Sequence, residues 1–280
     1  MEQIILILTY NCNLNCKYCP TKKTNNKITL DIANKAIRII KPTNIKFFGG
    51  EPLLEWELIK KIVQNYKCKY ELTTNGILLN TNKIRFMIRN NFEIRVSIDG
   101  DDNSQKKNRE IISKNIIRKI LPFKENIILN MVIAANQVTE FTNNFNYLTK
   151  KGFRNFNLLP AFYTKWNKKE INELKNQLNL VTQIIKDNSK IYIRNKDINK
   201  KNYLFNDGYV IDTDGGIYNT NKIMINPFYS KKNEYKIANI KKIDDIKTIK
   251  IDANKIKQKT KFDKINLELD NIITKFVNDL

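Results

Sequence analysis

Between residue 4 and about residue 160, six apolar runs of strand length alternate with stretches that have the apolar spacing of amphipathic helices. Apolar strands separated by helices predict a parallel sheet covered by helices and joined by right-handed crossovers. Six such units are too few to close an eight-stranded barrel, so the pattern predicts an α/β fold, a partial (β/α)6 barrel. The predicted strands are Ile4–Leu8, Ile45–Phe48, Tyr70–Thr73, Ile94–Ile98, Ile127–Ile133 and Phe153–Leu158, and the predicted helices lie near 29–41, 53–66, 80–90, 108–121 and 138–150.

The segments that follow these strands are polar or rich in glycine. Because the carboxyl ends of parallel strands lie along one edge of a sheet, and because sites in parallel α/β folds form there, these segments predict a single functional site. In chain order they are Tyr10–Pro20, which contains three cysteines, Gly49–Pro52 (GGEP), Thr74–Gly76 (TNG), Ser97–Gly100 (SIDG) and Asn157–Pro160.

Cys12, Cys16 and Cys19 have C-x3-C-x2-C spacing. Thiolates bind iron–sulfur clusters and zinc, but a structural zinc site normally closes with four ligands. The chain has no histidine, which also excludes histidine-based nucleophile pairs, and Cys68 is its only other cysteine. Three thiolates suit a [4Fe–4S] cluster with one iron open to another ligand; a purely electron-transferring cluster or a zinc site are the alternatives. Cys68 is interpreted as a packing residue.

These motifs resemble those of the radical S-adenosylmethionine (SAM) enzymes. The C-x3-C-x-aromatic-C loop and the GGEP segment are similar to that family's motifs, and the resemblance covers residues 4 to about 160. It implies that Cys12, Cys16 and Cys19 bind one [4Fe–4S] cluster whose fourth iron binds SAM. It also implies reductive cleavage of SAM to a 5′-deoxyadenosyl radical that abstracts a substrate hydrogen. The implied SAM contacts are Tyr18 and Leu159 at the adenine, Gly49, Gly50 and Glu51 at the methionine moiety, and Asn75, Ser97, Asp99 and Arg109 at the ribose and carboxylate.

One loop departs from the family pattern. In many peptide-modifying members a His-Asp pair and then an Arg follow the SIDG motif, whereas here the stretch is Gln105–Arg109 and only the arginine is kept. Arg109 is interpreted either as a partner of a SAM carboxylate or as a solvated residue at the start of a helix.

Beyond residue 160 the pattern changes to that of a small C-terminal α+β extension. A long helix is predicted near 168–187, then short segments at 190–194 and 203–212, a β-hairpin around Asp212–Gly216, and a helical tail from about 242 to 280. The hairpin and the segment Tyr235–Ile240 resemble the SPASM/twitch extension, in which cysteines after the hairpin bind auxiliary clusters. Asn219 and Asn221 stand at those positions here. We therefore expect a radical SAM core over 1–165 and, over 166–280, a substrate-binding extension without metal that closes the open bottom of the barrel.

The resemblance makes a peptide or protein side chain the expected substrate, because peptide maturases dominate the SPASM/twitch lineage. The alternatives are a small-molecule or nucleotide substrate or, in a different class, a non-catalytic iron–sulfur electron-transfer protein. We expect no leader-binding domain before the first strand, so a peptide would bind the extension or use a separate leader-binding partner. A flavodoxin- or ferredoxin-type electron donor is also expected.

The chain carries 50 Lys and Arg against 28 Asp and Glu, a formal net charge of +22. Only eight of the 50 are Arg, the residue of bidentate phosphate and base recognition. Because A/T-rich codons favour Lys, Asn and Ile, we attribute most of this charge to codon usage and expect no nucleic-acid partner. No apolar run approaches the ~18–20 residues of a membrane helix, and the acidic start is too short for a signal peptide. We expect a cytoplasmic protein with reduced thiols.

Overall fold

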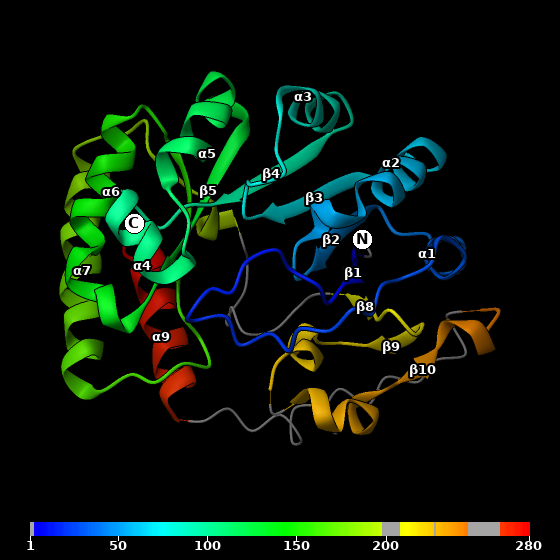
Figure 1. Ribbon diagram of the computed structural model, residues 1–280. Coiled ribbons are helices and arrows are strands. Elements are labelled where there is room, and N and C mark those ends of the chain that lie inside the picture. The colour runs from blue at the N-terminus through cyan, green and yellow to red at the C-terminus, as the bar shows by residue number, and fades with distance from the viewer. Residues whose placement is uncertain (1–2, 198–207, 227, 246–263) are drawn as a thin grey trace.

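The structure is a computed structural model that describes residues 3–197, 208–226, 228–245 and 264–280. Six parallel strands lie side by side in chain order, each close to a strand predicted from the sequence (Figure 1). The sheet does not close in the described part of the chain, because its edge strands are not neighbours. The predicted partial barrel is therefore confirmed. Its strands are β1 (Gln3–Thr9), β2 (Asn44–Gly49), β3 (Lys69–Thr74), β4 (Phe92–Ser97), β5 (Ile127–Ile133) and β6 (Asn155–Pro160).

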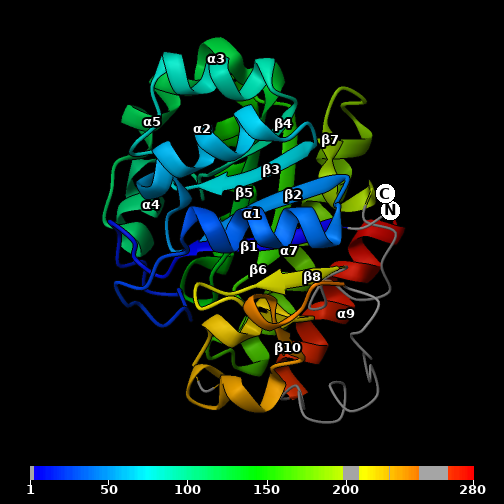
Figure 2. The same cartoon turned by 90° about the vertical axis from the view of Figure 1, so that its right-hand side faces the viewer.

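Shorter strands extend this sheet at both edges. At one edge β7 (Tyr192–Ile193) pairs with β6. At the other, β8 (Tyr209–Ile211) pairs with β1 in parallel, and β9 (Gly216–Tyr218) and β10 (Ala238–Asn239) follow in antiparallel pairing. The predicted hairpin is confirmed as β8 and β9, but it continues the barrel sheet and does not form a separate sheet (Figure 2). Part of the predicted segment 203–212, residues 203–207, lies outside the described residues.

Helices cover the outer face of the sheet (Figures 1 and 2). Most of them fall within the predicted stretches because their apolar positions recur at helical spacing and face the sheet. In α1 the residues Ile32, Ala33, Ala36, Ile37 and Ile40 are buried. Polar caps begin several of these helices; Asn80, for example, accepts a hydrogen bond from the Lys83 N–H at the start of α3. The helices concerned are α1 (Leu30–Ile40), α2 (Trp56–Asn65), α3 (Thr81–Arg89) and α6 (Phe141–Lys150).

The helical stretch predicted near 108–121 contains α5 (Ser113–Ile120), but it does not begin at 108: a separate helix that was not predicted, α4 (Asp102–Arg109), precedes α5. Asp101 caps α4 by accepting a hydrogen bond from the Ser104 N–H at 2.8 Å. Glu110 ends it in a left-handed conformation with φ of 61°, its N–H donating to the Lys106 carbonyl. The sequence of α4 has no apolar stripe, so hydrophobic periodicity did not reveal this helix.

Two long helices complete the described chain. The predicted helix near 168–187 is confirmed as α7 (Lys168–Lys186), which begins with a capping box between Asn167 and Glu170. In the predicted tail, α9 (Lys264–Asn278) is helical and packs against α7 and β6. Residues 243–245 are not helical, and 246–263 lie outside the described residues. None of the described helices combines the length and apolar character that crossing a membrane requires.

The two faces of the sheet differ in polarity. On β3 and β4 the outward side chains, such as Tyr70, Leu72, Ile94 and Val96, belong to the apolar core beneath the helices. Side chains that alternate with them point to the inner face and are polar or charged. There Arg95 pairs with Glu71 at 3.0 Å, and Arg194 pairs with Glu93 at 2.8 Å. At β3 and β4 the inner face of the partial barrel is therefore polar.

Candidate active site

The cysteine loop, residues 10–20, leaves the end of β1 and is held by backbone hydrogen bonds to two neighbouring elements. The Glu51 N–H, after β2, donates to the Asn11 carbonyl at 2.9 Å. The Lys17 N–H donates to the carbonyl of Asn108, near the end of α4, at 2.8 Å. The loop is thus fixed from both sides by the protein itself.

The three thiols of this loop lie near one another without converging on a single point. Cys12 and Cys16 are half-buried and Cys19 is exposed. Burial raises the pKa of Cys12 and Cys16, and the charges of the neighbouring cysteines raise the pKa of Cys16 further. In the described ranges, no three Cys, His, Asp or Glu side chains surround a point suited to one metal ion. A four-iron cluster binds each thiolate through a different iron, so this soft donor set fits such a cluster better than a single zinc ion.

Gly49 and Gly50 lie where the end of β2 meets the cysteine loop. Gly49 has φ of +152°, and a Cβ there would lie 2.4 Å from the Thr9 carbonyl oxygen. A Cβ on Gly50 would lie 2.2 Å from the Asn11 carbonyl oxygen. Contact with the loop backbone therefore already requires glycine at both positions, whatever ligand approaches them.

Glu51 joins the ends of β2 and β3. Its side chain is buried, and Oε1 accepts hydrogen bonds from Thr74 Oγ1 at 2.8 Å and from the Leu53 N–H at 3.0 Å. Oε2 accepts from the Asn75 N–H at 2.8 Å. Burial raises the pKa of Glu51, and these hydrogen bonds oppose that shift. The Asn75 amide in turn donates to Asn13 Oδ1 at 2.8 Å, which ties β3 to the cysteine loop.

A buried ion pair ties β4 and α4 to the same loop. Arg109 Nε and Nη2 donate to the two carboxylate oxygens of Asp99 at 2.8 and 3.0 Å. The Tyr18 hydroxyl donates to Asp99 Oδ2 at 2.5 Å, and the Arg109 guanidinium lies 5.3 Å from the Tyr18 ring centroid. The interpretation of Arg109 as a solvated residue at a helix start is wrong, because it is buried and ends α4.

Ser97 and Leu159 occupy the strand ends further along the same edge. Ser97 ends β4 opposite Asn130 of β5, and Leu159 lies on β6 opposite Val132. The Asn157 amide donates to Asn130 Oδ1 at 2.6 Å. The predicted site residues thus come to one edge, and hydrogen bonds tie Glu51, Asn75 and Asp99 to the cysteine loop.

Two residues of α4 were missed by sequence reasoning. Gln105 is fully buried; its Oε1 accepts from the Asp99 N–H at 2.8 Å, and its Nε2 donates to the Ser97 carbonyl at 3.3 Å. Asn108 is buried and donates to Gln137 Oε1 at 2.5 Å. With Arg109, they stand at positions i, i+3 and i+4 and share one helix face. That spacing, directly after the SIDG motif, was the available signal.

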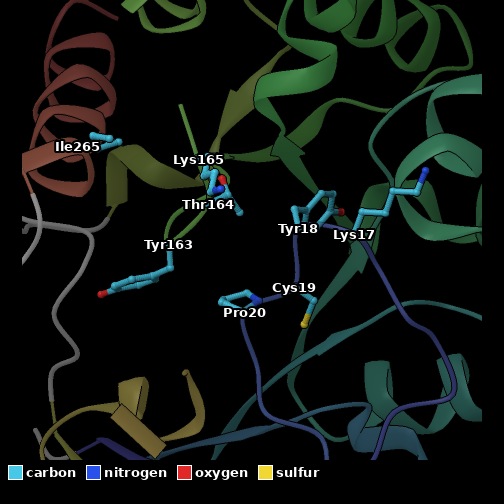
Figure 3. Close-up of a pocket in the computed structure, with 8 residues that line it drawn as sticks. All are labelled: Lys17, Tyr18, Cys19, Pro20, Tyr163, Thr164, Lys165 and Ile265. Atoms are coloured by element: carbon cyan, nitrogen blue, oxygen red, sulfur yellow. The ribbon is translucent and has the colours of Figure 1, made fainter. Parts of the chain in front are cut away.

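A cleft of about 460 Å³ opens between the cysteine loop and the loop after β6. Figure 3 shows Pro20 and Tyr163 on opposite sides of this cleft. Tyr163 has φ of +62°, and its N–H donates to Asn266 Oδ1 of α9 at 2.7 Å. Sequence reasoning did not find this contact because 103 positions separate the two residues. The lining residues are Lys17, Tyr18, Cys19, Pro20, Tyr163, Thr164, Lys165 and Ile265.

The hairpin of β8 and β9 is held by ion pairs at its turn. Lys232 donates to the fully buried Asp212 at 2.7 Å, and Lys236 donates to Asp214 at 3.1 Å. Cys68 packs against the main core, where its thiol donates to the Pro42 carbonyl at 3.4 Å.

Known proteins share sequence similarity with this chain over the region that contains the site. A family model described as the radical SAM superfamily matches residues 6–178. The radical SAM cyclopropyl synthase TigE of Paramaledivibacter caminithermalis is 28% identical over 212 residues, 61% of this chain and 44% of that protein. A probable GTP 3′,8-cyclase of Sulfurisphaera tokodaii is 24% identical over 74% of this chain and 71% of its own length.

The fold resembles the structure of native anSMEcpe with bound AdoMet and Kp18Cys peptide, with a TM-score of 0.74 and 19% identity, over 91% of this chain and 82% of that one. This chain spans less than half the length of the first two curated relatives that it matches. Since the family model covers more than half of the chain, including the cysteine loop and the strands that hold it, the chain belongs to the radical SAM superfamily.

Proposed function

We propose that this protein is a radical SAM enzyme in which Cys12, Cys16 and Cys19 hold one [4Fe–4S] cluster. Members of the superfamily use such a cluster together with SAM, which supply the radical that removes a hydrogen atom from the substrate. The observation that carries the assignment is that the cysteine loop is fixed by the ends of β2 and α4 and keeps three free thiols near one another.

The polar strand ends beside this loop are the proposed SAM site. Gly49, Gly50 and Glu51 after β2, Asn75 after β3, and Ser97 at the end of β4 would contact SAM, together with Tyr18 of the loop and Leu159 of β6. Asp99 and Arg109 would support this site. SAM carries charged groups, and a polar, hydrogen-bonded environment lowers the cost of burying them.

The proposed substrate is a peptide or protein side chain. The cleft between the cysteine loop and Tyr163 supports this choice because it is open and because both of its charged lining residues are lysines, which would suit an acidic segment. A fold shared over most of the chain with an enzyme structure that contains a peptide adds to this support. In this proposal residues 166–280 form the substrate-binding extension, and a separate flavodoxin- or ferredoxin-type protein supplies electrons.

A nucleotide is the second candidate substrate. The similarity to a probable GTP 3′,8-cyclase over 74% of this chain favours it. Cationic lining residues of the cleft would suit phosphates as well as carboxylates, so charge alone does not separate the two substrates.

The first experiment tests the cluster. After anaerobic reconstitution we expect about four iron and four sulfide per chain and, with dithionite and SAM, slow formation of 5′-deoxyadenosine. Cys16→Ala should abolish that formation, whereas the matched control Cys68→Ala should keep both cluster and product. About eight iron per chain would contradict a single cluster, and one zinc without sulfide would contradict the assignment.

The second experiment tests the substrate. The reduced enzyme and SAM are incubated with short peptides encoded beside this gene and, in parallel, with GTP. Mass spectrometry then measures the masses of the products. We expect a mass change in a peptide, with faster formation of 5′-deoxyadenosine. A change in GTP alone would favour the second candidate.

A further inference from the structure

The chain that leaves the cysteine loop pairs with a segment of the C-terminal extension. The Lys22 N–H donates to the Met224 carbonyl at 2.7 Å. The Asn226 N–H donates in the opposite direction, to the Pro20 carbonyl at 3.3 Å. An isolated antiparallel β-bridge joins the residues between these two bonds. Residues 224–226 of the extension therefore fix the carboxyl end of the cysteine loop.

The amino end of the cysteine loop contacts the extension as well. Tyr10, the first residue of the loop, is fully buried, and its ring lies edge-on to the ring of Tyr229 with 5.5 Å between the centroids. The Lys232 ammonium lies 5.8 Å from the centroid of the Tyr10 ring and 5.5 Å from that of Tyr229. These distances are those of cation–π contacts. Tyr229 and Lys232 belong to a 3-10 helix, η6 (Phe228–Tyr235), so the extension holds both ends of the loop.

Lys232 is held in this position by a buried carboxylate. Its ammonium donates to Asp212 Oδ2 at 2.7 Å, and the Asp212 side chain is fully buried while that of Lys232 is 18% exposed. A cation–π contact is stronger when the ammonium is largely removed from water, as it is here. The second ion pair of the same turn joins Lys236 to Asp214 at 3.1 Å. Among the described residues, Lys236 makes no cation–π contact with a ring of the cysteine loop.

The same 3-10 helix supports the opposite wall of the cleft. Phe228, at the start of η6, packs edge-on against Tyr163, with 6.0 Å between the ring centroids. Tyr163 lines the cleft across from Pro20 of the cysteine loop (Figure 3). Phe228 thus contacts one wall of the cleft, while the next residue, Tyr229, contacts the root of the other wall.

We propose that residues 224–226 and η6 position the cysteine loop and thereby the cluster that it holds, with Lys232 fixing the root of the loop at Tyr10. Three thiolates must reach three irons of one cluster, so a loop that is fixed at both ends is already arranged for binding. Lys232 acts through Tyr10 and is therefore a positioning residue. This inference rests on the proposed function for the cluster, and it gives the extension a second role besides substrate binding.

The first test is retention of the cluster in Lys232→Met. The reconstituted, oxidised holoenzyme is incubated anaerobically with EDTA, and the cluster absorbance and the protein-bound iron are followed. Iron loss should be about 2- to 30-fold faster than in the wild type, the range that corresponds to the strength of a cation–π contact. Lys232→Arg should lose iron more slowly than Lys232→Met, because a guanidinium keeps the charge and also stacks on aromatic rings.

Lys236→Met is the matched control. It breaks the other ion pair of the same turn and leaves Tyr10 untouched, so it should lose iron at the wild-type rate. Lys232→Met also leaves the buried Asp212 without its partner. The double variant Lys232→Met/Asp212→Asn removes this uncompensated charge and should still lose iron faster than the wild type, which separates positioning of the loop from charge imbalance in the hairpin.

The second test uses the protein without a cluster. The Tyr10 N–H donates to the Asn26 carbonyl at 2.9 Å, and its hydrogen exchange reports opening of the loop root. Exchange at Tyr10 should be faster in Lys232→Met and unchanged in Lys236→Met, while amides of α7 keep their wild-type rates in both. This measurement depends on neither the cluster nor SAM.

Equal iron loss in Lys232→Met and Lys236→Met, or unchanged exchange at Tyr10 in Lys232→Met, would overturn the inference. Should circular dichroism show that Lys232→Met does not fold, Tyr229→Leu, which removes the second ring beside the ammonium, must show both effects. A wild-type protein that assembles no four-iron cluster would overturn the proposed function instead, and exchange at Tyr10 would still decide whether the extension holds the loop.

Discussion

Removing the Asn266 side chain should loosen the wall of the cleft at Tyr163. Tyr163 adopts a left-handed conformation with φ of +62°, which costs a bulky residue about 1–2 kcal/mol. Its N–H is held by Asn266 Oδ1 at 2.7 Å, and Asn266 is 1% exposed. In Asn266→Ala this N–H loses its partner, a loss that costs about 1–3 kcal/mol at a buried site.

The assay is amide hydrogen exchange of Tyr163, because this amide is the group that loses its partner. A decrease of about 1–3 kcal/mol in the free energy of local opening corresponds to exchange about 5- to 150-fold faster. Fluorescence of Trp166, whose indole N–H donates to the Ala161 carbonyl in the same loop, gives a second signal in a Trp56→Phe background.

Asn195→Ala is the matched control. Asn195 is also a fully buried asparagine that holds backbone next to the site, since its amide bonds both the N–H and the carbonyl of Leu158. Leu158 lies in a regular strand, so its release should not speed exchange at Tyr163. Unchanged exchange in Asn266→Ala, or equal acceleration in both variants, would refute the reasoning.

Three further predictions concern other parts of the chain. Burial lowers the pKa of Lys222 to about 7, so the folded state releases this proton at a lower pH than the unfolded state. The free energy of unfolding should therefore rise by up to about 1.4 kcal/mol per pH unit from pH 7 toward 10.5. Urea unfolding of Lys222→Met at several pH values should lack this dependence on pH. Glu51→Gln should lower the free energy of unfolding by about 2 kcal/mol, because an amide replaces the carboxylate that accepts from the Asn75 N–H. Titration with SAM should show weaker binding to this variant, while the absorbance of the cluster persists. Asp212→Ala should cost about 1–3 kcal/mol by leaving Lys232 without its carboxylate and should lower substrate turnover; unchanged thermal unfolding would contradict this.

Local patterns were sufficient to predict the strands and most helices of the barrel. The outward residues of β3 and β4, such as Leu72 and Val96, are fully buried because helices cover that face, and this apolar character is visible in the sequence. The α4 helix was not predicted because its buried residues are polar. Its inner face is formed by Gln105, Asn108 and Arg109, whose burial is supported by hydrogen bonds and not by apolar contact, so no hydrophobic periodicity marks it.

Contacts between distant segments could not be predicted from one sequence. The hairpin was predicted from its turn, but the parallel pairing of β8 with β1 joins residues about 200 positions apart and follows no local rule. Similarly, the helical character of α9 was predicted, whereas the contact of Asn266 with Tyr163 depends on how that helix packs on α7. The glycines after β2 were predicted to serve a ligand, yet their first constraint is the backbone of the cysteine loop.

The polarity of the inner face at β3 and β4 can be read from the sequence. Strands buried on both faces read as continuous apolar runs, as β1 does, whereas β3 and β4 alternate apolar residues with polar or charged ones. The interior of a closed eight-stranded barrel is packed with bulky branched side chains. The inner face of this partial barrel instead carries Glu71, Glu93, Arg95 and Ser97. Ionic groups are costly to bury against apolar walls and much less so among hydrogen-bonded partners. The alternation along β3 and β4 therefore indicates a polar interior whose charges are paired within the protein. Glu71 accepts hydrogen bonds from Gln3 and Asn44, so this cluster lies toward the amino ends of the strands and not at the edge where the cysteine loop lies.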